Sequence, residues 1–362
     1  MPEITSILLV GAENIIALPI IRSLGAVLPD AKIHTFSPSK KSKSVSERSK
    51  FISSHHYFNC WKDNLPQKLI EKIAETKADL VLPVSDNAVR LLISNKHELK
   101  KLVYLPPLPP LDVYDQLEKK DQMANLLTHH HFQAPKTWDL KDTLPDDLNE
   151  NDFPLLIKPI DGSSGMGIQK IHHKQHLADI IKGVNKSNYI LQEIIPGQDL
   201  GCSVLAVDGE IKAYTIQKVL VHKNFGVATA IRFVDHPEVL ESTKKLINLT
   251  GYSGLAHLDF RLDERDNMPK LIDFNARFWF SLLGSKAAGV DFTLLCCLTA
   301  TGTAFVRPEY KNIIYLAGIN TLRYYMRKVF SPKKAFLPKA SVYTDFWDRI
   351  GDPMPEVARF IW

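Results

Sequence analysis

A proline-rich run divides this chain into parts that must fold separately. Residues 105–111 read Leu-Pro-Pro-Leu-Pro-Pro-Leu. Prolines remove backbone donors and fix φ, so neither a helix nor a central strand can pass through this run. The run therefore predicts a stiff connection between domains. The chain has 362 residues, and at roughly 150 residues per domain this length suggests two or three domains.

The part before this run opens with a strand, a turn and a helix. Residues 6–10 are a short apolar run closed by Gly11, and apolar positions then recur with helical spacing until Gly25. A second such unit begins with a buried strand at residues 80–83. Alternating strands and helices predict a parallel sheet. A bound NAD is disfavoured, because the first turn has one glycine where a dinucleotide site needs G-x-G-x-x-G.

Charge and cysteine content disfavour several classes of protein. The 45 Lys and Arg residues exceed the 40 Asp and Glu residues by only five, which is far from the dense basic stripe of a nucleic-acid-binding protein. Four scattered cysteines form neither a disulfide framework nor a metal knuckle. No apolar run reaches the roughly 18 residues that span a bilayer, and the first residues lack the charged region of a signal peptide. We therefore expect a cytoplasmic protein without a nucleic-acid partner or a transmembrane segment.

A glycine-rich turn follows an apolar strand in the middle of the chain. Within residues 153–169 the strand presents Lys158, and the turn at Asp161–Gly167 reads Asp-Gly-Ser-Ser-Gly-Met-Gly. Small residues let backbone N–H groups approach an anion, and an ammonium group can neutralise a phosphate. The segment lacks the Gly-Lys-Ser/Thr of a P-loop, and no H-R-D or D-F-G of a protein kinase follows it. A flexible hairpin tip is the alternative interpretation.

A second candidate nucleotide contact lies at the end of the next strand. The strand at residues 189–193 runs into Gln192-Glu193-Ile194-Ile195-Pro196-Gly197-Gln198-Asp199. A strand that leaves its sheet here would free backbone groups for an adenine edge, and Asp199 could accept hydrogen bonds from ribose hydroxyls. An ordinary loop is the alternative. Further on, Asp208-Gly209 predicts a tight hairpin.

Two later strands predict a cluster of polar side chains. Alternation along residues 255–263 puts His257, Asp259 and Arg261 on one face, and alternation along residues 270–277 does the same for Asp273, Asn275 and Arg277. Two carboxylates, an amide and an arginine would then converge. All-oxygen ligands suit Mg²⁺, which keeps waters and shares substrate phosphates. A solvated polar face with a cross-strand ion pair is the alternative.

The joint order of these segments resembles the ATP-grasp superfamily, the carboxylate-amine ligases that include D-alanine-D-alanine ligase and biotin carboxylase. The resemblance extends from about residue 5 to residue 305, and residues 275–292 look closest to the carbamoyl-phosphate-synthetase-like or amino-acid-ligase branch. It implies a mixed α/β and α+β architecture. The implied parts are an N-terminal parallel α/β domain (1–112), a helix with a small lid subdomain (113–200), a catalytic antiparallel-sheet domain (201–330) and a C-terminal extension of unknown role (331–362).

The resemblance implies an ATP site. Lys120 and Lys158 stand where the family binds phosphates, with Lys119 as the alternative to Lys120. Asp199 stands where the family usually has a ribose-binding Glu, which is one methylene longer. The other ATP-binding residues implied come from the glycine-rich loop of the lid and from the hinge that meets adenine: Gly162, Ser163, Ser164, Gly165, Gly167, Gln192, Glu193 and Ile195.

The resemblance also implies a metal site and two catalytic residues. Asp259, Asp273 and Asn275 match the ligands of two Mg²⁺ ions, with Mn²⁺ as an acceptable substitute. Asp273 replaces a longer Glu, so metal bridging there would be looser or water-mediated. Arg277 and Lys158 match the residues that steady the transferring phosphate and the acyl phosphate.

The implied activity is that of an ATP-dependent ligase. A substrate carboxylate attacks the γ-phosphorus to give an acyl phosphate and ADP, and an amine then displaces phosphate to form an amide. The implied partners are small-molecule carboxylates and amines, and dimers are common among relatives. The alternative is a nucleotide-binding protein of regulatory or scaffold role with little turnover. The candidates for the substrate pocket are Ser85, Asp86, Ser281 and Lys286.

Overall fold

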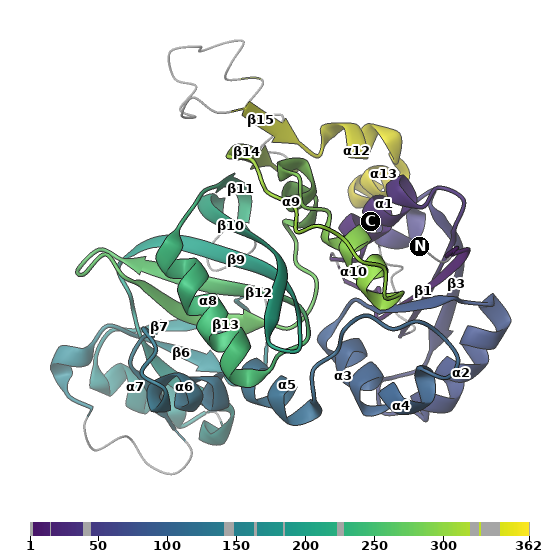
Figure 1. Cartoon of the computed structure of the whole chain (residues 1–362). Helices are drawn as coiled ribbons and strands as arrows, with labels where there is room; N and C mark the ends of the chain where they lie inside the picture. Colours follow the sequence, from purple (N-terminus) through teal and green to yellow (C-terminus); the bar gives the residue numbers. More distant parts are fainter. Residues whose placement is uncertain are drawn as a thin grey trace.

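Three sheets organise the protein in the computed structural model (Figure 1). Two sheets have four strands each, and the third has seven. The structure describes residues 3–14, 16–38, 45–140, 148–162, 165–183, 185–222, 228–318, 326 and 341–361.

The N-terminal sheet is parallel, with the strand order β3-β2-β1-β4. Its strands are β1 (Ser6–Val10), β2 (Lys32–Pro38), β3 (Ile52–Phe58) and β4 (Leu80–Pro83). β1 and β4 are buried along their whole lengths, as expected of strands covered by helices on both faces. The accompanying helices are α1 (Ala17–Val27), the single turn η1 (Val45–Arg48), α2 (Leu65–Thr76), α3 (Asp86–Ser94) and α4 (Lys96–Leu99). The predicted parallel α/β arrangement is confirmed.

The sequence predicted that the first helix ends at Gly25, and this prediction is wrong. α1 continues through it to Val27. A side chain at this position would place its Cβ 2.2 Å from Cδ1 of Phe51. The glycine is therefore explained by close packing inside the helix and not by helix termination.

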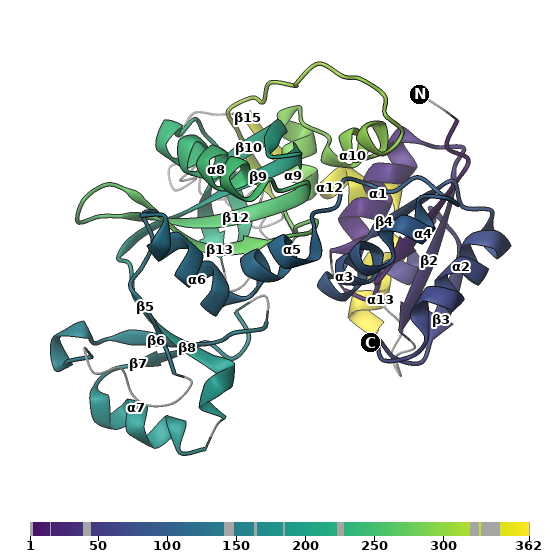
Figure 2. The same cartoon turned by 60° about the horizontal axis from the view of Figure 1, so that its bottom comes forward.

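A small antiparallel sheet follows the proline-rich run. The helices α5 (Leu111–Glu118) and α6 (Lys120–His129) lead into it, and α6 buries Met123, Leu126 and Leu127. The sheet has the order β5-β8-β6-β7. Figure 2 shows it together with α7, set apart from the seven-stranded sheet. Its elements are β5 (Thr137–Asp139), η2 (Glu150–Asp152), β6 (Leu155–Pro159), β7 (Gln169–Ile171), α7 (Lys174–Ile181), η3 (Lys186–Asn188) and β8 (Tyr189–Glu193).

The large sheet has the order β13-β12-β9-β10-β11-β14-β15 and is antiparallel except for the β14–β15 pair. Its β9–β10 hairpin turns at Asp208 and Gly209, whose φ angles of 49° and 79° suit the predicted tight turn. Its strands are β9 (Gly197–Val207), β10 (Glu210–His222), β11 (Ala228–Phe233), β12 (Gly254–Asp263), β13 (Pro269–Asn275), β14 (Ile313–Leu316) and β15 (Ser341–Thr344). The helices beside it are α8 (Pro237–Thr250), α9 (Leu282–Ala288) and α10 (Phe292–Ala300).

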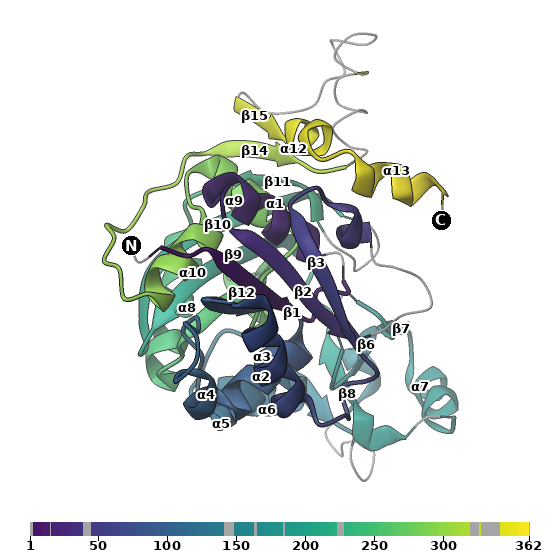
Figure 3. The same ribbon diagram turned by 90° about the vertical axis from the view of Figure 1, so that its right-hand side faces the viewer.

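The C-terminal elements join the first sheet to the last. β15 extends the large sheet beside β14, and it is followed by α12 (Phe346–Gly351) and α13 (Met354–Ile361) (Figure 3). Between these helices Asp352 is completely buried. Its carboxylate accepts hydrogen bonds from Arg22 Nε at 3.2 Å and from Ser49 Oγ at 2.7 Å. The extension, whose role the sequence left open, thus ties α1 to the edge of the large sheet.

Within the described part of the chain, no single helix has the length and apolar character needed to cross a membrane. One pair, α9 and α10, passes that test only when the two are taken together, and it is bent by 92°.

We expect Asp352→Ala to destabilise the fold, because it leaves the guanidinium of Arg22 buried without its main partner. Breaking a buried ion pair from one side typically costs about 3–5 kcal/mol. Chemical denaturation followed by circular dichroism should show this loss as a lower unfolding midpoint. The matched control is Asp179→Ala, which removes an exposed partner of Lys182 on α7. Equal midpoints for the two variants would show that the buried pair does not hold the C-terminal elements in place.

Candidate functional site

Two carboxylates face each other across β12 and β13. Asp259 lies directly opposite Asp273, and His257 lies opposite Asn275. The amide Nδ2 of Asn275 donates to Asp259 Oδ2 at 3.0 Å. The structure therefore brings together the three residues that the sequence predicted as metal ligands.

The electrostatics of this carboxylate pair fit a divalent cation. Burial raises the pKa of Asp273, the like charge of Asp259 adds to that shift, and Lys120 and Lys158 oppose it. Two carboxylates and an amide oxygen are the donors that Mg²⁺ prefers, with its remaining positions filled by water or phosphate. Among the described residues, no cluster of three or more His, Cys, Asp or Glu side chains could hold a metal ion. A cation here would therefore depend on the Asn275 amide and on oxygens from outside the chain.

Two lysines from other elements lie within electrostatic range of Asp273. Lys158 on β6 is buried, and its Nζ donates to Gln192 Oε1 on β8 at 2.5 Å. Burial lowers its pKa to about 8, while the nearby carboxylate of Asp273 favours the charged form.

Lys120, the first residue of α6, donates from Nζ to the carbonyl oxygen of Gly162 at 2.8 Å. The charges of both Lys120 and Lys158 act on Asp273. Lys119, the alternative to Lys120, occupies the N-cap position of α6.

The predicted hinge is held by arginines from the β12–β13 region. Arg261 on β12 donates from Nε to the carbonyl oxygen of Ile195 at 2.7 Å and from Nη1 to Asp199 at 2.5 Å. Glu193 accepts from Arg265 Nη2 at 2.7 Å. The predicted adenine and ribose contacts are therefore positioned by Arg261 and Arg265. Alternation placed Arg261 on the polar face, but nothing in the sequence assigned it this role.

The glycine-rich loop adopts backbone conformations that glycine favours. Gly162, Gly165 and Gly167 have φ angles of 144°, 72° and 77°, which side-chain-bearing residues rarely adopt. A Cβ at Gly167 would also approach Cγ of Pro159 to 2.8 Å. The predicted residues Ser163 and Ser164 lie outside the described residues.

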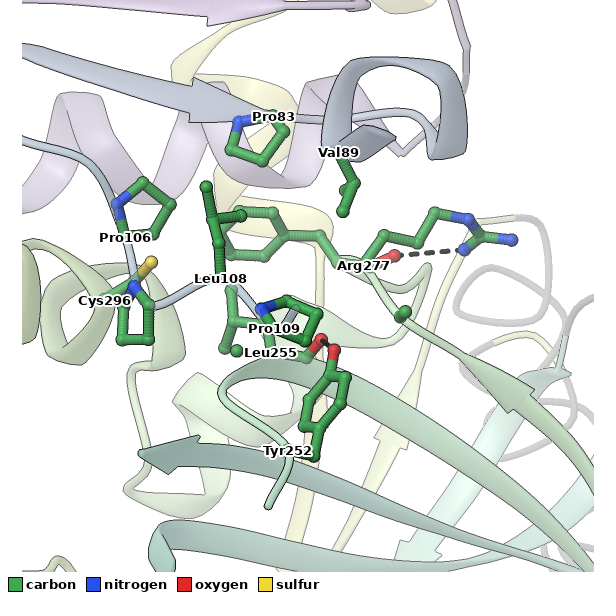
Figure 4. A pocket seen from close by; sticks show the side chains of 13 residues that line it. Pro83, Val89, Pro106, Leu108, Pro109, Tyr252, Leu255, Arg277 and Cys296 are labelled. Atoms are coloured by element: carbon green, nitrogen blue, oxygen red, sulfur yellow. Dashed lines mark hydrogen bonds between the residues drawn. The ribbon is translucent and has the colours of Figure 1, made fainter. Parts of the chain in front are cut away.

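Arg277 lies just beyond β13 and is nearly buried. Its Nη2 donates to Asn275 Oδ1 and its Nη1 donates to the carbonyl oxygen of Phe278, both at 3.1 Å. Its Nε lies 2.9 Å from Asp86 Oδ1 on α3. Figure 4 shows a small cavity beside its stem, lined mainly by apolar groups, and the guanidinium points away from that cavity. The apolar cavity therefore does not provide the polar site.

The four substrate-pocket candidates have different surroundings. Asp86 reaches Arg277, and Ser281 donates to Gln217 Oε1 at 2.9 Å. Ser85 is buried against Gly11, and its hydroxyl has no hydrogen-bond partner among the residues that the structure describes. Lys286 pairs with Asp291 at 2.9 Å and donates to Ser23 on α1. Lys286 is therefore engaged with the N-terminal part of the chain and does not join the carboxylate pair.

His257 also lies at the site, although the sequence analysis assigned it no role. Its Nε2 lies 3.4 Å from Asp259 Oδ1, and its Nδ1 lies 2.8 Å from Ser203 Oγ on β9. Its ring stacks on that of Trp279. Alternation gave a signal for His257, because it shares a face with Asp259. Ser203 gave none, because its contact depends on the pairing of β9 with β12.

Comparison with known families accounts for this arrangement. Residues 117–281 match the family model described as an ATP-grasp domain. All of the predicted ATP, metal and catalytic residues lie within this matched range. Asp86, which contacts Arg277, lies outside it.

Solved structures share the ATP-grasp fold over most of the chain. The ADP complex of N5-carboxyaminoimidazole ribonucleotide synthetase aligns with a TM-score of 0.68 at 16% identity, covering 94% of this chain and 91% of that one. L-amino acid ligase from Bacillus licheniformis aligns with a TM-score of 0.64 at 16% identity, covering 86% and 76%. At these identities the likeness shows the fold.

Curated relatives match the chain over shorter segments. D-alanine–D-alanine ligase B from Clostridium tetani is 26% identical over 166 residues, which cover 41% of this chain and 45% of that protein. The matched segments cover between 45% and 69% of the lengths of such relatives. The chain thus spans only about half to two thirds of the length of these relatives.

Proposed function

We propose that this protein is an ATP-dependent carboxylate-amine ligase. It would activate a carboxylate as an acyl phosphate, and an amine would then displace phosphate to give an amide, ADP and phosphate. One observation carries the proposal: Lys120 and Lys158 lie within electrostatic range of Asp273, which faces Asp259 across β12 and β13 in the segment that matches the ATP-grasp model. That combination suits the binding of a metal-bound triphosphate.

The names of the relatives support a ligase. They include D-alanine–D-alanine ligase, D-aspartate ligase from Enterococcus faecium and L-amino acid ligase. A fold neighbour was solved with the magnesium salt of ADP. We therefore propose ATP with two Mg²⁺ ions as the cofactors, with Mn²⁺ as a substitute, and small-molecule carboxylates and amines as the substrates.

The side chains of the site suit separate tasks in this reaction. Asp259, Asp273 and Asn275 would hold the Mg²⁺ ions, which supply positive charge against the triphosphate. Lys120 and Lys158 would neutralise phosphate oxygens from the side of the small sheet, and Arg277 would stabilise charge at the acyl phosphate. None of these groups needs to form a covalent bond, because phosphoryl transfer depends mainly on positioning and charge.

Each part of the chain would contribute to the reaction. In this proposal residues 1–112 help to line the substrate site, residues 113–200 cover the nucleotide as a lid, and residues 201–330 provide the catalytic sheet. Residues 331–362 would brace the first part against the last. A lid is needed because water would hydrolyse an acyl phosphate.

We expect carboxylate-dependent release of ADP from the wild-type chain, and a loss of it in Asp273→Asn. The variant keeps the side chain's shape but removes one of the two opposed charges. Loss of a group that supports a metal site typically costs at least about 10–100-fold. The measurement is a coupled ADP assay with ATP, Mg²⁺ and a panel of amino acids and dipeptides.

Asp179→Asn on α7 is the matched control for that assay. It should retain full activity, because this residue is exposed and pairs with the nearby Lys182 and Gln175. The ligase proposal fails if ADP release by the wild-type chain never exceeds the Asp273→Asn background. Tight binding of ATP without product would instead support the regulatory or scaffold alternative.

Nucleotide affinity should fall above about pH 8. Burial holds the pKa of Lys158 at about 8 in the free protein, so its ammonium form predominates below that pH and is lost above it. A bound phosphate favours the ammonium form, so binding above pH 8 must take up a proton. Affinity should then decrease by up to about tenfold per pH unit. Calorimetry of MgADP binding at pH values on either side of 8 measures this decrease.

Lys158→Arg separates this effect from other titrations, because the guanidinium stays charged across the range. Its MgADP affinity should lose the decrease above pH 8. An unchanged decrease in this variant would mean that another group is responsible.

A further inference from the structure

Asp86 connects the parallel sheet to the proposed catalytic arginine. It is the first residue of α3, and its Oδ1 lies 2.9 Å from Nε of Arg277. In this ion pair the Arg277 side chain is almost fully buried, with 8% of it exposed, whereas 38% of the Asp86 side chain is exposed. An ion pair with one partner this well buried is less screened by solvent than a surface pair.

The guanidinium is held at all three of its nitrogens. Asp86 engages Nε, the carbonyl oxygen of Phe278 engages Nη1, and Asn275 Oδ1 engages Nη2. A guanidinium has five N–H donors, and each terminal nitrogen carries two of them. Each terminal nitrogen therefore keeps one further N–H, which can pair with an oxygen of a carboxylate or a phosphate.

Asp86 differs from the other two partners in where it is anchored. Asn275 and Phe278 are within two residues of Arg277 along the chain and move with its backbone. Asp86 belongs to α3, which follows β4 of the N-terminal sheet. It is therefore the partner that fixes the guanidinium relative to a separate part of the protein.

The ion pair of Asp86 and Arg277 lies at one end of a chain of hydrogen bonds that leads to the carboxylate of Asp259. Arg277 donates to Asn275, and Asn275 donates to Asp259 Oδ2. The amide of Asn275 is thereby oriented, with its oxygen toward Arg277 and its nitrogen toward Asp259. A guanidinium released by Asp86 would no longer orient that amide, so the effect would extend to the proposed metal ligands.

We propose that Asp86 is a positioning residue that sets the orientation of Arg277 for catalysis. The inference rests on the proposed ligase function of this site. Asp86 acts through Arg277, so its loss lowers the rate of the chemical step with every carboxylate substrate alike.

A direct contact between Asp86 and a substrate amine is the competing interpretation. Burial raises the pKa of Glu118, and the nearby charge of Asp86 adds to that shift. The negative charge gathered there would also attract an ammonium group. The two interpretations differ in one measurable respect, which is whether the effect of Asp86 depends on an amine in the substrate.

The first experiment compares Asp86→Ala and Asp86→Asn with the wild-type chain in the ADP-release assay. Each is assayed with an amino acid that serves as the carboxylate substrate and with the same acid lacking its amino group. We expect Asp86→Ala to lower kcat by about ten- to a hundredfold, the size of effect typical of losing a polar partner of a charged group. The loss should be equal for both acids, with KM for ATP unchanged. Asp86→Asn should be less impaired, because it keeps the size of the side chain and an oxygen that can face Nε.

The matched control is Asp112→Asn, which changes an exposed acid in the first turn of α5 and should leave kcat unaltered. An unchanged kcat in Asp86→Ala overturns the proposal. A loss confined to the amine-bearing acid also overturns it, because Asp86 would then contact the substrate.

A second measurement does not depend on turnover. In protein labelled with ¹⁵N-arginine, the Nε–H resonance of Arg277 is identified by its absence in Arg277→Lys. We expect Asp86→Asn to shift this resonance and to speed its exchange with water, and Asp112→Asn to do neither. An unaltered resonance in Asp86→Asn overturns the positioning role. Absence of ADP release from the wild-type chain overturns the proposed ligase function instead.

Discussion

The candidate site depends on the compensation of charges that could not be buried singly. Asp259 and Asp273 oppose each other across two strands, and burial with like charge raises the pKa of Asp273. Lys158 is buried beside them, at a cost that lowers its own pKa. Each group is tolerated because the opposite charge is near. A metal-bound triphosphate would add both signs of charge and complete this compensation.

This compensation joins elements that belong to different sheets. Lys158 comes from the small sheet and the aspartates come from the large one, while Arg261 and Arg265 of the large sheet hold Ile195, Asp199 and Glu193 near the junction. Relative movement of the two sheets would therefore alter the charge balance of the site directly. In the proposed ligase, movement of the small sheet and binding of nucleotide would in this way be physically linked.

Local patterns allowed much of the fold to be predicted from the sequence. The hairpin at Asp208-Gly209 and the strands at residues 6–10 and 189–193 all follow from turn chemistry or the pattern of apolar residues. Alternation also placed Asp259 with Asp273, because a shared face is a local property of paired strands. Contacts between distant segments gave no such signal. Arg277 with Asp86 and Arg261 with Asp199 depend on how the sheets pack. Gly25 misled the prediction because its contact with Phe51 is tertiary.

The ion pair between Arg22 and Asp352 has a consequence for how the protein is made. The two residues are 330 positions apart. A ribosome adding about 5–20 residues per second needs on the order of tens of seconds to synthesise the intervening chain. During that interval the N-terminal sheet can assemble, but the guanidinium of Arg22 has no carboxylate partner from α13 or its preceding turn. The N-terminal part therefore reaches its final stability only after β15 and Asp352 have been synthesised, and folding of its last contacts is necessarily late.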